Sequence, residues 1–144
     1  MRYLDTSSLV ALYCPEAKTA RTIAHIERQH LPFALTWLHE VEFTNGLQLK
    51  LFRKEAAESA VSAALRALRA DVEAGVLQRT PISWPAVFET SLRLSTAHSR
   101  AAGTRTLDLL HVAAAIALQA TEFITGDKRQ AKVATKEGLK VITI

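Results

Sequence analysis

The chain has 144 residues, of which 49% are hydrophobic and 22% are charged. This composition is typical of a globular protein and differs from that of a disordered chain, and we expect a single domain over residues 1–144. The single cysteine, Cys14, excludes an intramolecular disulfide framework and argues against a cysteine-based zinc site.

No run of eighteen apolar residues is present, and the start of the chain lacks the basic and apolar regions of a signal peptide. We therefore expect a cytoplasmic protein with no membrane span. Eighteen basic residues against fourteen acidic ones give a net charge of +4, which permits an anionic partner such as nucleic acid but does not require one.

Strands and helices are predicted to alternate along the chain. We expect strands at residues 1–4, 31–36, 76–80, 122–125 and 139–144. We expect helices at residues 6–13, 16–29, 37–52, 54–74, 84–94 and 106–120, and a short basic helix after Asp127, with a linker-like loop at 98–104. This alternation predicts an α/β fold with a central, mainly parallel sheet of about five strands flanked by helices.

Acidic residues follow two of the predicted strands. Asp5 and Asp127 lie just after strands, where ligands bind in open parallel sheets. Each can equally be a helix N-cap, because aspartate is preferred there. The sequence alone leaves both interpretations open.

Two further carboxylates lie on predicted helices. Helical spacing places Glu42 in a stripe with Leu38, Val41, Asn45, Leu49 and Phe52. A carboxylate in that stripe must be paired or metal-bound, and Asn45 or an arginine could satisfy it instead of a metal. Glu40 projects to the opposite side, so Glu42 is the preferred candidate. Asp108 lies in the first turn of an apolar helix, where the helix dipole favours a carboxylate whatever its role.

Four such carboxylates near one sheet edge would repel one another unless a cation neutralised them. An all-oxygen set without cysteine suits Mg²⁺ or Mn²⁺ better than zinc. An ion of this kind polarises a phosphate and activates water. The set therefore suggests phosphodiester hydrolysis.

Four segments of the chain together resemble the successive motifs of PIN-domain proteins, and in particular of VapC-type toxins from bacterial toxin–antitoxin pairs. These segments are LDTSSLVALY at residues 4–13, TWLHEVEFTN at 36–45, RTLDLLHVAAA at 105–115 and FITGDKRQ at 123–130. The resemblance spans essentially the whole chain and implies a PIN-like three-layer fold.

The resemblance also implies an Mg²⁺- or Mn²⁺-dependent endoribonuclease that acts as the toxin of a type II pair. A cognate antitoxin would silence it, and the protein would commonly form a homodimer. By this resemblance Asp5, Glu42 and Asp108 hold the principal ion, and Asp127 completes the pocket or binds a second ion. The expected supporting residues are Thr6, Asn45 and Thr125.

Other polar and aromatic residues have less specific interpretations. His111 lies on the same helical face as Asp108 and could reach the pocket, although a packing or hydrogen-bonded structural role is favoured. The basic residues that could hold RNA phosphates, or could simply form a solvated face, are Arg105, Lys128 and Arg129. Trp37 and Trp84 are expected in the core or in a dimer contact.

Two alternative functions stay open at this point. One is a catalytically silent PIN-like module that binds RNA or a protein, with its carboxylates acting as caps and ion-pair partners. The other is a nuclease that acts on structured DNA.

Overall fold

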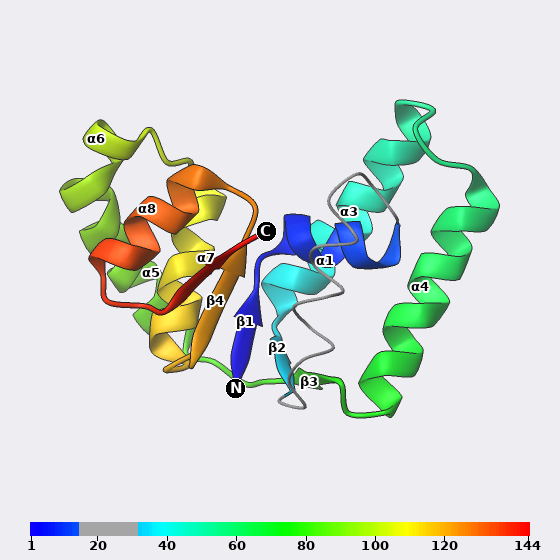
Figure 1. Ribbon diagram of the computed structural model, residues 1–144, viewed down its shortest axis with the longest axis horizontal. Helices are drawn as coiled ribbons and strands as arrows, with labels where there is room; N and C mark the ends of the chain where they lie inside the picture. Colours follow the sequence, from blue (N-terminus) through cyan, green and yellow to red (C-terminus); the bar gives the residue numbers. More distant parts are fainter. Residues whose placement is uncertain (15–31) are drawn as a thin grey trace.

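A five-stranded sheet forms the centre of the computed structural model, which describes residues 1–14 and 32–144 (Figure 1). Its strands are β1 (Arg2–Leu4), β2 (Phe33–Leu35), β3 (Leu77–Arg79), β4 (Glu122–Thr125) and β5 (Val141–Thr143). They pair in parallel in the order β3-β2-β1-β4-β5. The predicted parallel α/β fold is confirmed. The helix expected at 16–29 lies outside the described residues.

Helices cover both faces of this sheet. They are α1 (Thr6–Tyr13), α3 (Trp37–Phe52), α4 (Glu58–Glu73), α5 (Trp84–Leu94), the π-helical turn η1 (Ser95–Ser99), α6 (Arg100–Ala102), α7 (Thr106–Ala117) and α8 (Lys128–Lys136). Figure 1 shows α5, α7 and α8 on one side of the sheet and α1, α3 and α4 on the other. None of the helices in the described ranges is long and apolar enough to cross a membrane.

Alternation along the central strands builds one core on each face. Tyr3 and Phe123 are buried with residues of α5, α7 and α8, whereas Leu4 and Ile124 are buried with residues of α1, α3 and α4. Successive side chains of a strand point to opposite faces, so two adjacent apolar residues serve two different cores. The central strands are therefore apolar on both faces, as parallel strands between two helical layers must be.

Helix α3 departs from the sequence-based expectation in the face it buries. Its buried residues are His39, Phe43 and Leu47. Val41 and Phe52, placed in the expected stripe, are 65% and 83% exposed. The interpretation of that stripe as a core face is therefore wrong, because it turns toward a pocket and solvent.

The helix boundaries differ in three further places. Helix α4 begins at Glu58 and not at Lys54, whose backbone is left-handed with φ 58°. The loop expected at 98–104 is wrong, because helical structure continues through η1 and α6 to Ala102 and ends at Gly103, which has φ 67°. Helix α7 ends at Ala117, before Gln119 at φ 50°.

The sheet order reverses direction at β1. From β1 the chain moves through β2 to β3 on one side, and then returns to place β4 and β5 on the other side. Ligands of parallel α/β proteins bind beyond the carboxyl ends of the strands at such a switch point. Asp5 follows β1 and Asp127 follows β4, so both residues flank the switch point.

We expect Leu47→Ala to destabilise the protein by about 2–5 kcal/mol, because this fully buried leucine would leave a cavity beneath α3. Urea denaturation measures the loss. Val41→Ala on the same helix is the control, since its side chain is mostly exposed, and should change the free energy of unfolding by less than about 0.5 kcal/mol. Equal losses in the two variants would contradict the assigned face of α3.

Candidate active site

The end of β1 holds Asp5 in a fully buried position. Asp5 is the N-cap of α1, and its Oδ1 accepts a hydrogen bond from the Ser8 backbone N–H at 2.8 Å. Its Oδ2 accepts hydrogen bonds from the hydroxyls of Thr125 at 2.6 Å and Ser7 at 3.0 Å. The parallel pairing of Leu4 with Ile124 places Asp5 beside Thr125. Asp5 thus has a capping role, and its carboxylate is satisfied by protein donors.

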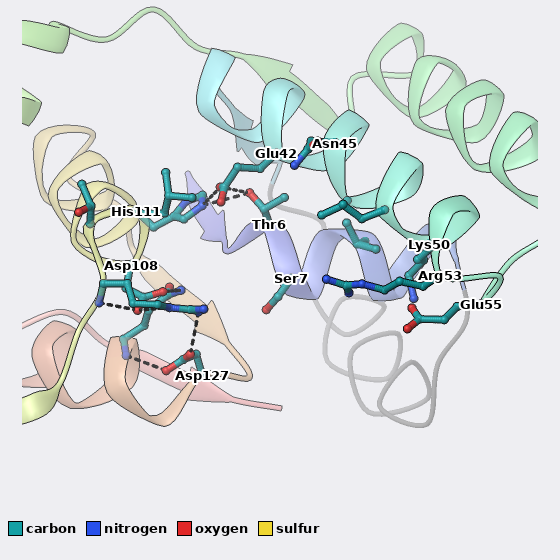
Figure 2. A pocket seen from close by; sticks show the side chains of 17 residues that line it. Thr6, Ser7, Glu42, Asn45, Lys50, Arg53, Glu55, Asp108, His111 and Asp127 are labelled. Carbon is teal, nitrogen blue, oxygen red and sulfur yellow. Dashed lines mark hydrogen bonds and ion pairs between the residues drawn. The ribbon is translucent and has the colours of Figure 1, made fainter.

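Glu42 projects from α3 toward α1 and α7 (Figure 2). Its Oε2 accepts a hydrogen bond from the Thr6 hydroxyl at 2.9 Å and another from Nε2 of His111. Burial opposes ionisation of this half-buried carboxyl, but the contacts with His111 and Thr6 outweigh it and lower the pKa of Glu42. Glu42 is therefore an ionised carboxylate at neutral pH.

His111 connects Glu42 to the sheet. Its Nδ1 lies 2.9 Å from the Tyr3 hydroxyl, and burial raises the pKa of Tyr3 well above its ordinary value. Because Tyr3 keeps its proton, it can donate to Nδ1, which leaves the Nε2–H of His111 to donate to Glu42. The sequence-based interpretation of His111 as a packing or hydrogen-bonded structural histidine is confirmed, although it did not identify Glu42 as the partner, and His111 also lines the pocket described below. Its position one helical turn after Asp108 was the only indication in the sequence.

Asp108 lies at the start of α7 and is 3% exposed. Its Oδ2 accepts hydrogen bonds from the Arg105 backbone N–H at 2.9 Å and from Arg105 Nε at 3.4 Å. Its Oδ1 accepts a hydrogen bond from Gln130 Nε2 at 3.2 Å. The other amide atom, Oε1 of Gln130, is buried and has no hydrogen-bond partner among the residues that the structure describes.

Asp127 is the N-cap of α8. Its Oδ1 accepts a hydrogen bond from the Arg129 backbone N–H at 2.7 Å, and its Oδ2 lies 3.2 Å from Arg129 Nη2 and 4.0 Å from Arg105 Nη2. Partial burial opposes ionisation, but the hydrogen bonds and charge of Arg129 prevail and lower the pKa of Asp127. Arg105 thus touches both Asp108 and Asp127.

One pocket of about 680 Å³ brings these groups together. Of the predicted carboxylates, Glu42, Asp108 and Asp127 line it, whereas Asp5 lies buried outside its lining. The other predicted residues that line it are Thr6, Asn45 and Arg105. Lys50 and Arg53, which sequence analysis did not select, also line it.

Three other residues considered in the sequence analysis are Asn45, Lys128 and Glu40. Asn45 makes no side-chain hydrogen bond within the described part of the chain, so Glu42 is satisfied by His111 and Thr6 and not by Asn45. Lys128 is exposed and lies outside the pocket lining. Glu40 forms an ion pair with Arg79 at 2.8 Å and lines a different pocket.

The donor chemistry of this pocket suits a hard divalent cation. Its carboxylate and amide oxygens are the ligands that Mg²⁺ and Mn²⁺ prefer, and Gln130 Oε1 is a buried acceptor without a donor. However, no three acidic, histidine or cysteine side chains within residues 1–14 and 32–144 form a ready-made metal cluster. Arg105 instead pairs with Asp108 and Asp127, and its side chain is 69% exposed. The oxygen donors of the pocket fit a hard divalent cation.

The profile of the PIN domain family matches residues 2–136, and the chain belongs to this family. No protein of curated function matches its sequence.

Several solved structures share this fold. FitAcB from Neisseria gonorrhoeae is similar with a TM-score of 0.68 and 16% identity, over 99% of this chain and 97% of that chain. VapBC2 from Rickettsia felis, bound to a DNA fragment from its promoter, has a TM-score of 0.65 and 16% identity over 99% and 98% of the two chains. VapBC-1 from nontypeable Haemophilus influenzae has a TM-score of 0.62 and 19% identity over 99% and 98%.

Beneath the pocket, His39 fixes the start of α3 against the end of β1. Its Nδ1 accepts a hydrogen bond from the Thr36 backbone N–H at 3.0 Å, and its Nε2–H donates to the Leu4 carbonyl at 2.8 Å. Burial, with a further contribution from neighbouring His111, lowers the pKa of His39 to about 3. The ring is therefore neutral in the folded protein.

We expect this neutral histidine to make folding sensitive to mild acid. The unfolded chain binds a proton at His39 near its ordinary pKa of about 6.5, whereas the folded protein does not, so stability falls as the pH drops below about 6.5. Between pH 7 and pH 5 the wild type should lose roughly 2 kcal/mol more than His39→Gln. Urea denaturation at several pH values measures the difference. If the free energy of unfolding of the two proteins changes with pH in parallel, His39 is not the neutral histidine described above.

Proposed function

We propose that the protein is a metal-dependent endoribonuclease and the toxin component of a type II toxin–antitoxin pair. The observation that carries the proposal is the meeting of Glu42, Asp108 and Asp127 in one open pocket, at the switch point of the sheet and beside Asp5. Membership of the PIN domain family supports it, because PIN domains are generally nucleases that use divalent metals.

In this proposal Asp5, Glu42 and Asp108 hold an Mg²⁺ or Mn²⁺ ion, and Asp127 completes the site or binds a second ion. When bound, such an ion polarises a phosphate and activates water for hydrolysis of the RNA backbone. Thr6 and His111 keep the Glu42 carboxylate directed into the pocket.

Basic side chains beside the carboxylates supply contacts for the RNA phosphates. Arg105 and Arg129 are paired with Asp108 and Asp127. Guanidinium groups bind carboxylate and phosphate with the same fork of N–H donors, so these arginines can exchange a carboxylate for a phosphate once a cation neutralises the acids. Lys128, which lies outside the pocket lining, is left with at most an outer contact.

A cognate antitoxin and a homodimer are further parts of the proposal. The antitoxin is supported by the shared fold with structures named VapBC, since VapC-type toxins pair with an antitoxin.

The homodimer is supported by large apolar side chains that are exposed to solvent. Trp37 and Leu92 are 70% and 71% exposed, Phe88 is 54% exposed, and the Trp84 ring lies 6.3 Å from that of Phe88. Trp37 is thus not a core residue.

A catalytically silent binding module is the second candidate, and one observation favours it. Asp5, Asp108 and Asp127 are each satisfied by protein donors as caps or ion-pair partners. Such a module would bind RNA or a protein without metal-dependent turnover.

We expect the purified protein, freed of any bound partner, to cleave RNA with Mg²⁺ or Mn²⁺ and not with EDTA. Glu42→Gln and Asp5→Asn should each reduce cleavage by roughly a hundredfold or more, because each removes a ligand charge. Gel analysis of total RNA, with a DNA substrate in the same buffer, measures the activity.

Glu40→Gln is the matched control, because it removes the same charge two residues away, outside the pocket. Its activity should equal that of the wild type. Full metal-dependent cleavage by Glu42→Gln would contradict the proposed site. RNA binding without turnover by the wild type would select the silent module.

A further inference from the structure

The pocket continues beyond the carboxylates along α3. Its far end is lined by Lys50 and Arg53, on the last turn and C-cap of that helix, and by Glu55. Figure 2 shows Glu42, Asp108 and Asp127 away from the Arg53 end, and the Arg53 side chain reaching into the pocket on the side of Ser7. The pocket is therefore a groove in which three carboxylates lie toward one end, whereas the other end carries Lys50 and Arg53 with the single carboxylate of Glu55.

Arg53 differs from Arg105, the other arginine that lines the pocket, in having no partner among residues 1–14 and 32–144. Arg105 and Arg129 are paired with Asp108 and Asp127. The Arg53 guanidinium makes no hydrogen bond or ion pair within the described part of the chain, and the adjacent Glu55 does not pair with it. A guanidinium directed into a groove and not paired with a described carboxylate is available for an anion.

Val10, Gly46 and Leu49 line the groove between the two ends. A single pocket thus extends from Glu42 to Arg53. An extended ligand can therefore contact both ends.

We propose that Arg53 binds a backbone phosphate of the RNA that flanks the phosphodiester held at the carboxylates. This inference rests on the proposed nuclease function and adds a second contact point for its substrate. The planar fork of a guanidinium matches two phosphate oxygens. A phosphodiester chain repeats its negative charge along its length, so a single strand can place one phosphate at the acidic end and another at Arg53.

An acidic peptide from a partner protein fits the groove less well. Its carboxylates would meet Glu42, Asp108 and Asp127 at one end and gain from Arg53 only at the other. Without a metal, the carboxylates at that end would also repel the phosphates of RNA. In the proposed function a bound cation neutralises the carboxylates, so a substrate phosphate can lie there.

The test compares Arg53→Gln, Arg53→Lys and the control Arg69→Gln. Arg69 is an exposed residue of α4 outside the pocket lining, so its substitution removes the same charge elsewhere. The probe is a labelled single-stranded RNA that the wild type cleaves. Binding is measured at several KCl concentrations in a Glu42→Gln background, and steady-state cleavage is measured in the active background.

We expect Arg53→Gln to raise Kd and KM roughly three- to tenfold and leave kcat nearly unchanged. The slope of log Kd against the logarithm of the KCl concentration should fall by about 0.7, which is the contribution of one phosphate contact with a single strand. Arg53→Lys should recover part of the affinity, because it keeps the charge without the fork. Arg69→Gln should match the wild type, and thermal melting and Mn²⁺ affinity should not change in any of these variants.

The outcomes separate this inference from the function on which it rests. If the wild type cleaves RNA but Arg53→Gln behaves as Arg69→Gln does, the subsite is refuted and the nuclease stands. If the folded wild type neither cleaves nor binds RNA, both proposals fail. Neutral methylphosphonate linkages introduced one at a time give a second check. At one position beside the cleaved bond, a neutral linkage should weaken RNA binding by the protein that keeps Arg53. The same linkage should have little effect on RNA binding by the Arg53→Gln variant.

Discussion

The contact between His111 and Glu42 joins the two helical layers at the edge of the sheet where the pocket opens. Glu42 belongs to the α3 layer and His111 to the α7 layer, and the same imidazole reaches Tyr3 on β1 and Thr6 on α1. A half-buried carboxylate is unfavourable unless donors surround it. This histidine supplies the donor, and the pocket can therefore hold an ionised Glu42 next to other acids.

Charge compensation explains the rest of the site. Each carboxylate has its own set of donors: hydroxyls and a helix N-terminus for Asp5, Arg105 and Gln130 for Asp108, and Arg129 for Asp127. Buried like charges are tolerable only when neutralised in this way or by a bound cation. Arg105 and Arg129 are 69% and 42% exposed. In the proposed function the arginine side of the pocket is therefore the entrance for a cation and for RNA.

Much of the fold could be predicted from the sequence, because strand and helix periods are local properties. The parallel sheet and the bounds of α3 follow from such patterns. The partners of the site residues could not be predicted, since His111 and Glu42 are 69 residues apart in the chain and meet only through tertiary packing. The same limit applies to Arg53, whose relevance depends on the direction of its side chain at the end of α3. The burial of Asp5 also required the register of β1 against β4.

The central claim is that this pocket holds a divalent cation, and anomalous diffraction from crystals grown with Mn²⁺ tests it most directly. The account predicts an anomalous peak among Asp5, Glu42 and Asp108, with Arg105 turned away from Asp108. It also predicts that the peak is absent from crystals of Glu42→Gln. Wild-type crystals with no peak in the pocket at saturating Mn²⁺, and with Arg105 still on Asp108 and Asp127, would contradict the account and leave the carboxylates as caps and ion-pair partners.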